Sequence, residues 1–309
     1  MTTAILQISD SHFGTEVAPV ERALRKLVEE LAPSAIIVSG DVTQRARRGQ
    51  FRAARRFLDS LPKIPIVATP GNHDIPMFAL ATRVLRPYSH WTEVFGTDLE
   101  PVLETDRVLV QCVNTTRWFR RKHGQISGAQ IERVANRIRR AKPEQLRVVV
   151  AHHPLLAIRE SDDNNLLRGH RQAVQAWMAA KVDIVMGGHI HLPYIRPLHA
   201  EVENPPHRSW VVQAGTAVSK RVREGIPNSV NVLRFSDTGP VHCAVERWDF
   251  QSAICAFEQL HSVDLPLTRA EPQPEAASSL VAPDDVEAER RLHDLADLSD
   301  LQGEGRAFE

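Results

Sequence analysis

Short apolar runs alternate with stretches of helical periodicity through most of this chain, and this alternation constrains its fold more than any other feature. The runs cover residues 4–8, 35–38, 64–68, 108–113, 148–151, 182–186 and 210–214, and the helical stretches cover residues 20–31, 50–61, 130–141 and 171–180. Short runs rich in β-branched residues predict buried strands. Strands that alternate with helices predict an α/β fold in which helices cover the sheets.

The segments 209–214, 230–235 and 241–248 predict successive strands of an antiparallel meander. Residues 264–309 have a different character, because prolines and small residues precede a run of acidic residues. We therefore expect a catalytic domain over residues 1–263. Residues 264–309 are expected to form a flexible acidic tail with at most one marginal helix over 284–301, which a protein partner or a second copy of the chain would bind.

The net charge of zero hides an asymmetry. Residues 264–309 carry 12 of the 38 acidic and four of the 38 basic residues, a net −8, which leaves 34 basic and 26 acidic residues in the rest, a net +8. A cationic body favours an anionic substrate such as a phosphate ester, although a simple balance of charge for solubility explains it equally well.

The cysteines and the apolar runs bear on location. Cys112, Cys243 and Cys255 are scattered and odd in number, which argues against a disulfide scaffold or a cysteine zinc site and fits a reducing compartment. The apolar runs fall short of the roughly 20 residues that span a bilayer, and the first residues do not resemble a secretory signal. The expected location is the cytoplasm, without a membrane span.

Polar residues follow five of the apolar runs, at the point where each predicted strand ends. They are Asp10 and His12, Asp41, Asn72 with His73 and Asp74, His152 with His153, and His189 with His191. Because binding sites form at the carboxyl ends of strands in α/β sheets, we expect these side chains to converge. Residues two apart in an extended segment point to the same side, so Asp10 can join His12, and His189 can join His191.

The chemistry of these side chains favours a pair of transition metals. Carboxylate, amide and imidazole ligands without thiolate suit Mn, Fe, Zn, Co or Ni better than Mg or Ca. Most of these motifs alone have an ordinary explanation as a turn or a helix cap, although Gly71-Asn72-His73-Asp74 is hard to explain by turn chemistry. Their joint order favours a metal site. Seven ligands exceed the needs of one four-coordinate ion and suit two divalent or mixed-valence ions that share one carboxylate. Such pairs lie roughly 3.5–4 Å apart and activate a bridging hydroxide for attack on phosphorus.

The motifs Asp10-x-His12, Gly40-Asp41, Gly71-Asn72-His73-Asp74, His152-x-Pro154 and Gly188-His189-x-His191 resemble those of the calcineurin-like metallophosphoesterases. The resemblance covers residues 5–215 and implies a four-layer α/β/β/α sandwich with a dinuclear site. It implies that Asp10, His12 and His191 hold one ion, that Asn72, His152 and His189 hold the other, and that Asp41 bridges them.

The resemblance also implies roles beside the metals. His152 is selected over His153 because the family's ligand lies two residues before the proline. His73 is assigned to the phosphoryl or leaving-group oxygen, as a stabiliser or general acid. Asp74 is a candidate for orienting an imidazole, and a simple turn carboxylate is the alternative.

The compact motifs differ from the longer motifs of the protein serine/threonine phosphatases. They are similar to bacterial class III cyclic-nucleotide phosphodiesterases, as is the segment 213–221. This similarity implies a small phosphodiester as the substrate, with cAMP first; glycerophosphodiesters and nucleotide-linked lipid pyrophosphates are alternatives. Arg221 would contact the substrate in this branch, or else lie on the surface. Arg47 and Arg48 are further candidates for attracting an anion.

Two other classes of function remain to be weighed. A nuclease would share these motifs, but aromatic residues do not interleave the arginines as stacking on nucleic acid favours, so nucleic acid is not the expected partner. A non-catalytic scaffold would have lost ligands, whereas all seven are present here. The sequence leaves the oligomeric state open, and a homodimer is compatible with it.

Overall fold

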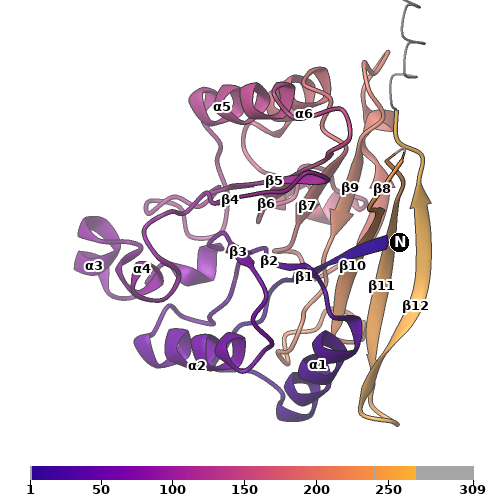
Figure 1. The fold of residues 1–309 in the computed structure, drawn as a ribbon. Helices are drawn as coiled ribbons and strands as arrows, with labels where there is room; N and C mark the ends of the chain where they lie inside the picture. Colours follow the sequence, from indigo (N-terminus) through magenta and orange to yellow (C-terminus); the bar gives the residue numbers. More distant parts are fainter. Residues whose placement is uncertain (1, 240, 269–309) are drawn as a thin grey trace, which may run out of the picture. The chain divides into compact units, whose positions relative to one another are not determined.

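The computed structural model describes residues 2–239 and 241–268 (Figure 1). Its strands are β1 (Thr2–Ile8), β2 (Ala35–Val38), β3 (Ile66–Ala68), β4 (Val102–Glu104), β5 (Val108–Val113), β6 (Leu146–Ala151), β7 (Ile184–Gly187), β8 (Tyr194–Pro197), β9 (Trp210–Gln213), β10 (Ser229–Ser236), β11 (Cys243–Gln251) and β12 (Ala256–Leu265). Its α-helices are α1 (Ala18–Leu31), α2 (Arg48–Asp59), α3 (Leu80–Leu85), α4 (Ser89–Phe95), α5 (Gly128–Arg139) and α6 (His170–Ala179). Short 3₁₀ helices are η1 (Asn72–Asp74), η2 (Glu160–Asn165) and η3 (Leu198–Glu201).

The strands form two mixed sheets. The first has the order β12-β11-β10-β1-β2-β3, and the second has the order β4-β5-β6-β7-β9-β8. In the first sheet β1, β2 and β3 run parallel, and in the second β5, β6, β7 and β9 run parallel. Parallel neighbours end at the same edge of their sheet, so the loops that follow β1, β2 and β3, and those that follow β6 and β7, leave from common edges.

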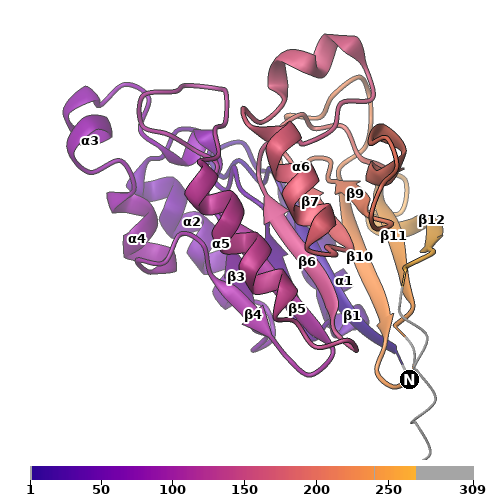
Figure 2. The same cartoon turned by 90° about the horizontal axis from the view of Figure 1, so that it is seen from above.

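Three apolar clusters define four layers. Between the sheets, side chains such as Ile5 and Ile37 of the first sheet meet Val110, Val148 and Ile184 of the second. The outer face of the first sheet packs against α1 and α2, and the outer face of the second packs against α5 and α6. Figures 1 and 2 show one helical layer outside each sheet. The predicted α/β/β/α sandwich is therefore confirmed.

The four long helices lie where the apolar periodicity predicts them, because each buries one stripe of side chains. In α1 the buried residues Val20, Leu24, Leu27 and Val28 recur at helical spacing. In α5 the hydroxyl of Ser127 accepts a hydrogen bond from the backbone N–H of Gln130, which satisfies a donor that the first turn leaves unpaired. No helix of the described residues combines the length and the apolar character that crossing a bilayer requires.

The predicted antiparallel meander is wrong for its first strand. β9 pairs in parallel with β7, through Ile184 and Trp210 among others, and so belongs to the second sheet. The antiparallel neighbours of β10 are β1 on one side and β11 on the other. The local sequence of a segment predicts that it forms a strand. The sheet that the strand joins depends on contacts with residues distant in the sequence.

The end of the domain extends past the predicted boundary at residue 263. Asp264 and Leu265 belong to β12, which pairs antiparallel with β11. Leu265 is buried in the core between the sheets. The predicted marginal helix over 284–301 lies outside the described residues, as do all residues from 269 onward.

Candidate metal centre

The loops that follow the parallel strands lie against one another through backbone hydrogen bonds. Asp10 donates its N–H to the carbonyl of Gly40 at 3.1 Å, and His12 donates to the carbonyl of Asp41 at 3.0 Å. Across the second sheet, the N–H of Gly188 donates to the carbonyl of His152 at 2.9 Å. These bonds join four of the five polar motifs into two pairs, one at the edge of each sheet.

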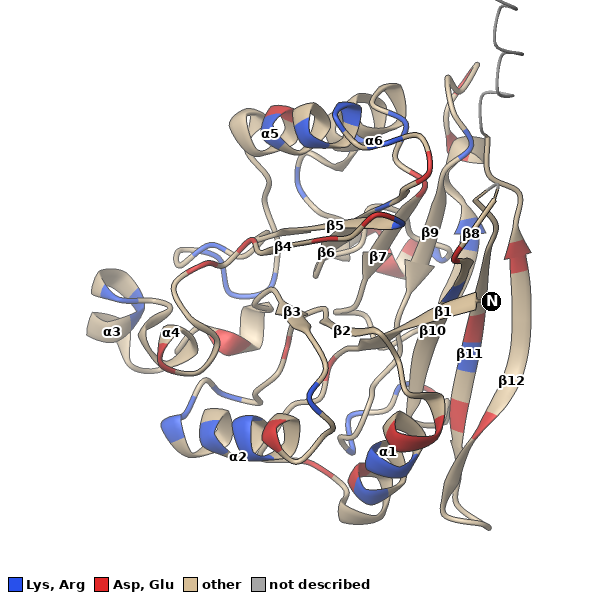
Figure 3. Cartoon of the chain, in the orientation of Figure 1, with Lys and Arg blue, Asp and Glu red and all other residues tan. Residues whose placement is uncertain are grey.

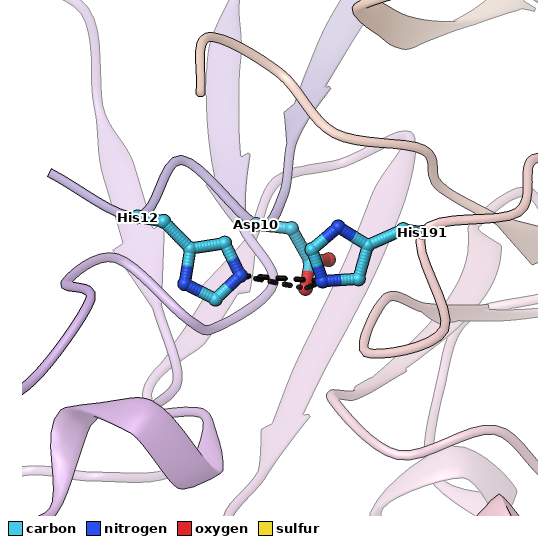
Figure 4. Close-up of side chains that lie close together, drawn as sticks. All are labelled: Asp10, His12 and His191. Atoms are coloured by element: carbon cyan, nitrogen blue, oxygen red, sulfur yellow. Dashed lines mark hydrogen bonds and ion pairs between the residues drawn. The ribbon is translucent and has the colours of Figure 1, made fainter. Parts of the chain in front are cut away.

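Asp10, His12 and His191 converge on one point (Figure 4). Asp10 Oδ1 lies 3.7 Å from His12 Nε2 and 3.5 Å from His191 Nε2, and the two imidazole nitrogens are 3.3 Å apart. Asp10 and His12 are fully buried, and His191 is nearly so. Three ligand atoms around one point suit a transition metal ion.

A second group of ligand atoms surrounds the other side of Asp41. Asp41 Oδ1 lies 3.3 Å from His152 Nε2, and Asp41 Oδ2 lies 3.7 Å from His12 Nε2. Ligand atoms of Asp41, His152 and His189 lie within 4.8 Å of one another. The two carboxylate oxygens of Asp41 therefore face ligand atoms of both groups.

Several buried polar atoms of these residues have no hydrogen-bond partner, as expected of atoms that bind a metal ion. Among the described residues, such atoms include both ring nitrogens of His189 and the side-chain oxygen of Asn72. Leaving a polar atom buried and unpaired costs free energy, so natural structures pair such atoms or use them to bind a ligand. The side-chain N–H of Asn72 donates to the carbonyl of Arg121 at 3.4 Å, which leaves the oxygen for a cation. The residues fit a metal site.

Five of these residues have left-handed backbone conformations. The φ angles are 51° at Asp10, 42° at His12, 47° at Asp41, 75° at His189 and 58° at His191. Residues other than glycine avoid this region, and such strain gathers at functional sites. The backbone is therefore not extended as predicted, and turns after each strand aim these side chains. Asp10 and His12 still join the same group as predicted, whereas His189 and His191 join different groups.

Hydrogen bonds behind the ligand atoms hold their orientation. Asp10 Oδ2 accepts from Ser9 Oγ at 2.7 Å and from the N–H of His189 at 3.0 Å. The Nδ1–H of His152 donates to the carbonyl of Ser39 at 2.8 Å, and Nδ1–H of His191 donates to the carbonyl of Arg221 at 2.6 Å. Each bond assigns the proton to Nδ1 and leaves Nε2 as a lone-pair donor, which is the arrangement that metal-binding histidines adopt.

Of the two interpretations of Asp74, the hydrogen bonds favour the carboxylate that holds turns together over the partner of an imidazole. Its carboxylate accepts hydrogen bonds from the backbone N–H groups of Val42, Thr43 and Gly71 and from the hydroxyl of Thr43, at 2.8–3.1 Å. Asp74 thus joins the loop that carries Asp41 to the loop that carries Asn72. Burial, followed by the charge of Asp41, raises the pKa of Asp74 to about 6.

The charges of the site are strongly coupled. Burial opposes ionisation of Asp41, but the positive potential of His152 and His73 lowers the pKa of this carboxyl well below its usual value. Burial opposes protonation of His152, but Asp41 raises its pKa to about 9. Burial lowers the pKa of both His12 and His189 well below that of a free imidazole.

His73 lies at the open side of the site. Its backbone N–H donates to Asp41 Oδ1 at 2.8 Å, and its Nδ1–H donates to the carbonyl of Gln44 at 2.8 Å. Its Nε2 lies 3.2 Å from a guanidinium nitrogen of Arg221, which also donates to Gln44 Oε1 at 3.2 Å. A cavity of about 170 Å³ beside it is lined by Gln44, Arg45, His73, Ile75, Met77 and Phe78.

The other arginine candidates lie apart from these groups. Arg48 pairs with Glu93 at 3.3 Å, with both side chains largely exposed, and Arg47 precedes the first turn of α2. Neither contacts a ligand residue through a hydrogen bond or ion pair that the described residues contain. Of the arginines that the sequence singled out, Arg221 is the one beside His73.

His153 is buried and has both ring nitrogens engaged. Its Nε2–H donates to the carbonyl of Lys122 at 3.0 Å, and its Nδ1 accepts from the hydroxyl of Thr115 at 2.7 Å. Burial, together with the neighbouring His152, lowers the pKa of His153 to about 3. This neutral, fully bonded imidazole is a structural group, which agrees with the selection of His152.

Sequence analysis missed a polar network below the site. The side-chain amide of Gln7 donates to Ser39 Oγ and to the carbonyl of Gly187, both at 3.0 Å, and the amide of Asn231 donates to Gln7 Oε1 at 2.8 Å. Gln213 donates to the carbonyl of Gly188. The sequence gives one indication of this network, because Gln7 and Gln213 each interrupt an apolar run. A single glutamine in a run does not show which groups it will bond to.

The chain is similar to known phosphoesterases in its sequence pattern and in its fold. The sequence pattern of the calcineurin-like phosphoesterases matches residues 3–193. No curated protein matches the sequence. The fold is similar to the purple acid phosphatase PPD1 from yellow lupin (Lupinus luteus), with a TM-score of 0.58 and 12% identity over 85% of this chain. The match covers 53% of the lupin protein, so this chain spans about half of its length.

Smaller proteins match with lower scores. The phosphoesterase Yfce from E. coli has a TM-score of 0.43 and 11% identity, over 85% of this chain and 100% of that one. Vps29 from Entamoeba histolytica, in its complex with Zn²⁺, has the same TM-score of 0.43 and 11% identity, over 85% and 100% of the two chains.

The layered fold and the clustered aspartates and histidines define the class as metallophosphoesterase. The family pattern covers more than half of the chain, and the chain therefore belongs to the calcineurin-like phosphoesterase family.

Proposed function

We propose that this protein is a dinuclear-metal phosphodiesterase. The observation that carries the proposal is the position of Asp41, whose two carboxylate oxygens face His152 at 3.3 Å and His12 at 3.7 Å. One ion would be held by Asp10, His12 and His191 and the other by Asn72, His152 and His189, with Asp41 shared between them. The orphaned nitrogens of His189 and the orphaned oxygen of Asn72 support the second set.

Two bound transition metal ions, drawn from Mn, Fe, Zn, Co or Ni, would supply an activated hydroxide and neutralise the phosphoryl oxygens. The chain's own residues perform the remaining tasks. His73 presents Nε2 toward the open side, where it can donate a proton to a leaving oxygen or stabilise a phosphoryl oxygen. Arg221 presents its guanidinium beside that nitrogen and supplies a fixed positive charge for an anionic substrate.

A phosphodiester, with a cyclic nucleotide such as cAMP first, is the substrate class that we propose. A diester carries one negative charge and a second organic group, which needs space beside the phosphorus. The cavity of about 170 Å³ next to His73 offers such space, with the apolar side chains of Ile75, Met77 and Phe78 on its walls. Glycerophosphodiesters and nucleotide-linked lipid pyrophosphates are the alternatives within the same chemistry.

We also propose a reducing compartment, the cytoplasm, as the place of action. Cys112 and Cys255 are free thiols, and Cys112 is buried. Burial raises the pKa of Cys112, which keeps this thiol protonated and unreactive. We further propose that the catalytic domain ends after β12, near residue 268, and not at residue 263.

The proposal is tested on purified full-length protein and its Asp41→Ala variant. Metal content is measured by elemental analysis after loading with Mn²⁺ and desalting. Turnover is measured with bis(p-nitrophenyl) phosphate, p-nitrophenyl phosphate, cAMP and glycerophosphocholine. We expect two ions per chain, preference for diesters over the monoester, and loss of both ions and nearly all activity in the variant.

Two results would refute this proposal. Full metal content in Asp41→Ala would contradict the shared role of that carboxylate. Faster turnover of the monoester than of every diester would place the protein among phosphomonoesterases instead.

A further inference from the structure

Six large apolar side chains are exposed on two segments near the site. Phe78, Leu80, Val84 and Leu85, in and before α3, have exposed fractions of 75%, 65%, 50% and 77%. Trp118 and Phe119, in the loop before α5, have exposed fractions of 44% and 56%. We call these six residues the apolar rim. Contiguous exposed apolar groups of this kind mark interaction surfaces.

A buried arginine holds the two segments together. The Arg83 guanidinium donates to the carbonyl of Pro76 at 3.0 Å and to the carbonyl of Arg120 at 2.5 Å. Figures 1 and 2 both show α3 beside the loop that leads into α5. The apolar rim is therefore one surface, although its members are far apart in sequence.

The apolar rim adjoins the candidate metal centre. Phe78 lines the cavity beside His73, and the Arg45 guanidinium lies 5.9 Å from the centre of the Phe78 ring. On the other segment, the carbonyl of Arg121 accepts from the side chain of Asn72 at 3.4 Å. Whatever binds the apolar rim lies next to the open side of the site.

Cations surround the apolar rim, and acids are absent from its two segments. Residues 75–92 and 115–131 contain no aspartate or glutamate. Arg86, Arg121 and Lys122 are exposed there, and the Arg120 guanidinium lies 5.4 Å from the centre of the Phe119 ring. Figure 3 shows Lys and Arg on α3 and on the neighbouring loop. Exposed aromatic and aliphatic tips among cations are typical of surfaces that bind an anionic lipid interface.

We propose that the apolar rim docks the protein onto an anionic phospholipid surface and so places the open side of the metal centre at that surface. Apolar tips enter the headgroup and acyl boundary, while Arg86, Arg121 and Lys122 meet the lipid phosphates. A second copy of the chain fits less well, because a two-fold contact through this surface would bring the same cations of both copies together.

The test is co-sedimentation of the full chain with vesicles, which needs no turnover and so is independent of the proposed reaction. Vesicles of phosphatidylcholine alone are compared with vesicles of phosphatidylcholine and phosphatidylglycerol in equal amounts. We expect binding to the mixed vesicles at low ionic strength, much weaker binding to the neutral ones, and weakening as salt rises.

Two double variants separate the apolar and the charged contributions. Phe78→Ser with Leu85→Ser should lower the partition coefficient on mixed vesicles by about tenfold or more, because two apolar side chains no longer enter the interface. Arg121→Gln with Lys122→Gln should lower it by about 25-fold, since each juxtamembrane cation contributes about fivefold.

Control variants alter exposed residues elsewhere on the chain. Ile254, with an exposed fraction of 57%, lies in the turn between β11 and β12, and Ile254→Ser should leave binding unchanged. Arg52→Gln with Arg56→Gln, on the exposed face of α2, controls for loss of charge alone. Thermal melts of all variants should match the unaltered chain, because every altered side chain is exposed.

Three outcomes would overturn the proposal. The first is equal or absent binding to both kinds of vesicle. The second is binding that the Ile254 or Arg52/Arg56 controls reduce as much as the variants of the apolar rim. The third is concentration-dependent self-association in sedimentation velocity that Phe78→Ser with Leu85→Ser abolishes, which would assign the surface to a second copy.

Discussion

The guanidinium of Arg221 lies 3.2 Å from Nε2 of His73, the one ring nitrogen of that histidine that faces the open side of the site. The other nitrogen is fixed, because Nδ1–H donates to the carbonyl of Gln44. The two side chains come from distant parts of the chain and meet beside the ligand atoms of His12 and Asp41, which lie within 4.8 Å of those of His73. This pairing gives different expected effects for the two residues.

His73→Ala should keep both metal ions but lower kcat by about 10²–10⁴-fold, the range that a positioned proton donor contributes. The ligand residues do not depend on the His73 ring, since its contact to Asp41 is made by the backbone N–H. Elemental analysis and steady-state kinetics on a diester check this. Loss of metal would instead make His73 a ligand, which its place near His12 and Asp41 allows geometrically.

Arg221→Ala should raise KM by about tenfold to a hundredfold, because a charged hydrogen-bond donor to the anionic substrate is removed. The metal content should stay unchanged, since His191 donates to the backbone carbonyl of Arg221, which the variant retains. Lys220→Ala removes an exposed neighbouring cation and is the matched control. If kcat falls in Arg221→Ala while KM stays unchanged, Arg221 does not bind the substrate and acts only through His73.

The positions of the ligand-bearing loops were predictable because a simple local rule generates them. Apolar runs become strands, and Asp10, Asp41, Asn72, His152 and His189 follow those strands at their carboxyl ends. Their convergence then follows from parallel pairing. The assignment of each residue to one of two ions rested on the family resemblance and stays a prediction.

What the sequence did not predict depends on contacts between distant segments. Asp74 looked like a partner for an imidazole, but its oxygens accept from backbone groups of Val42, Thr43 and Gly71, which only the folded loops bring near. The left-handed backbone at Asp10 and His189 could not be predicted, because only glycine marks such a conformation in a sequence. The apolar rim was not predicted, because the sequence alone does not tell whether Phe78 and Trp118 are buried or exposed.

Gly71→Ala should destroy the site through the backbone alone. A Cβ at this position would lie 2.1 Å from Asp41 Oδ1 and 2.2 Å from the Asp41 backbone nitrogen, distances that packed atoms do not reach. We expect loss of metal and of activity. Gly49→Ala is the control, because a Cβ there meets nothing within 4 Å in the first turn of α2. It should leave metal content intact and stabilise the chain by up to about 1 kcal/mol.

A pair of truncations locates the end of the catalytic domain. A chain ending at Thr268 retains all of β12, whereas one ending at Val263 removes Asp264 and Leu265, which pair with β11. Leu265 is 2% exposed in the core between the sheets, so its loss should cost about 2 kcal/mol or more.

We therefore expect the chain that ends at Thr268 to melt and turn over diester substrate like the full chain, and the chain that ends at Val263 to melt several degrees lower. Calorimetry and diester kinetics on the three proteins check this. Equal melting of the two truncations would show that the last residues of β12 contribute little. Loss of activity in the chain that ends at Thr268 would give residues 269–309 a part in the site. That chain keeps every ligand of the proposed metal centre and the whole of β11 and β12.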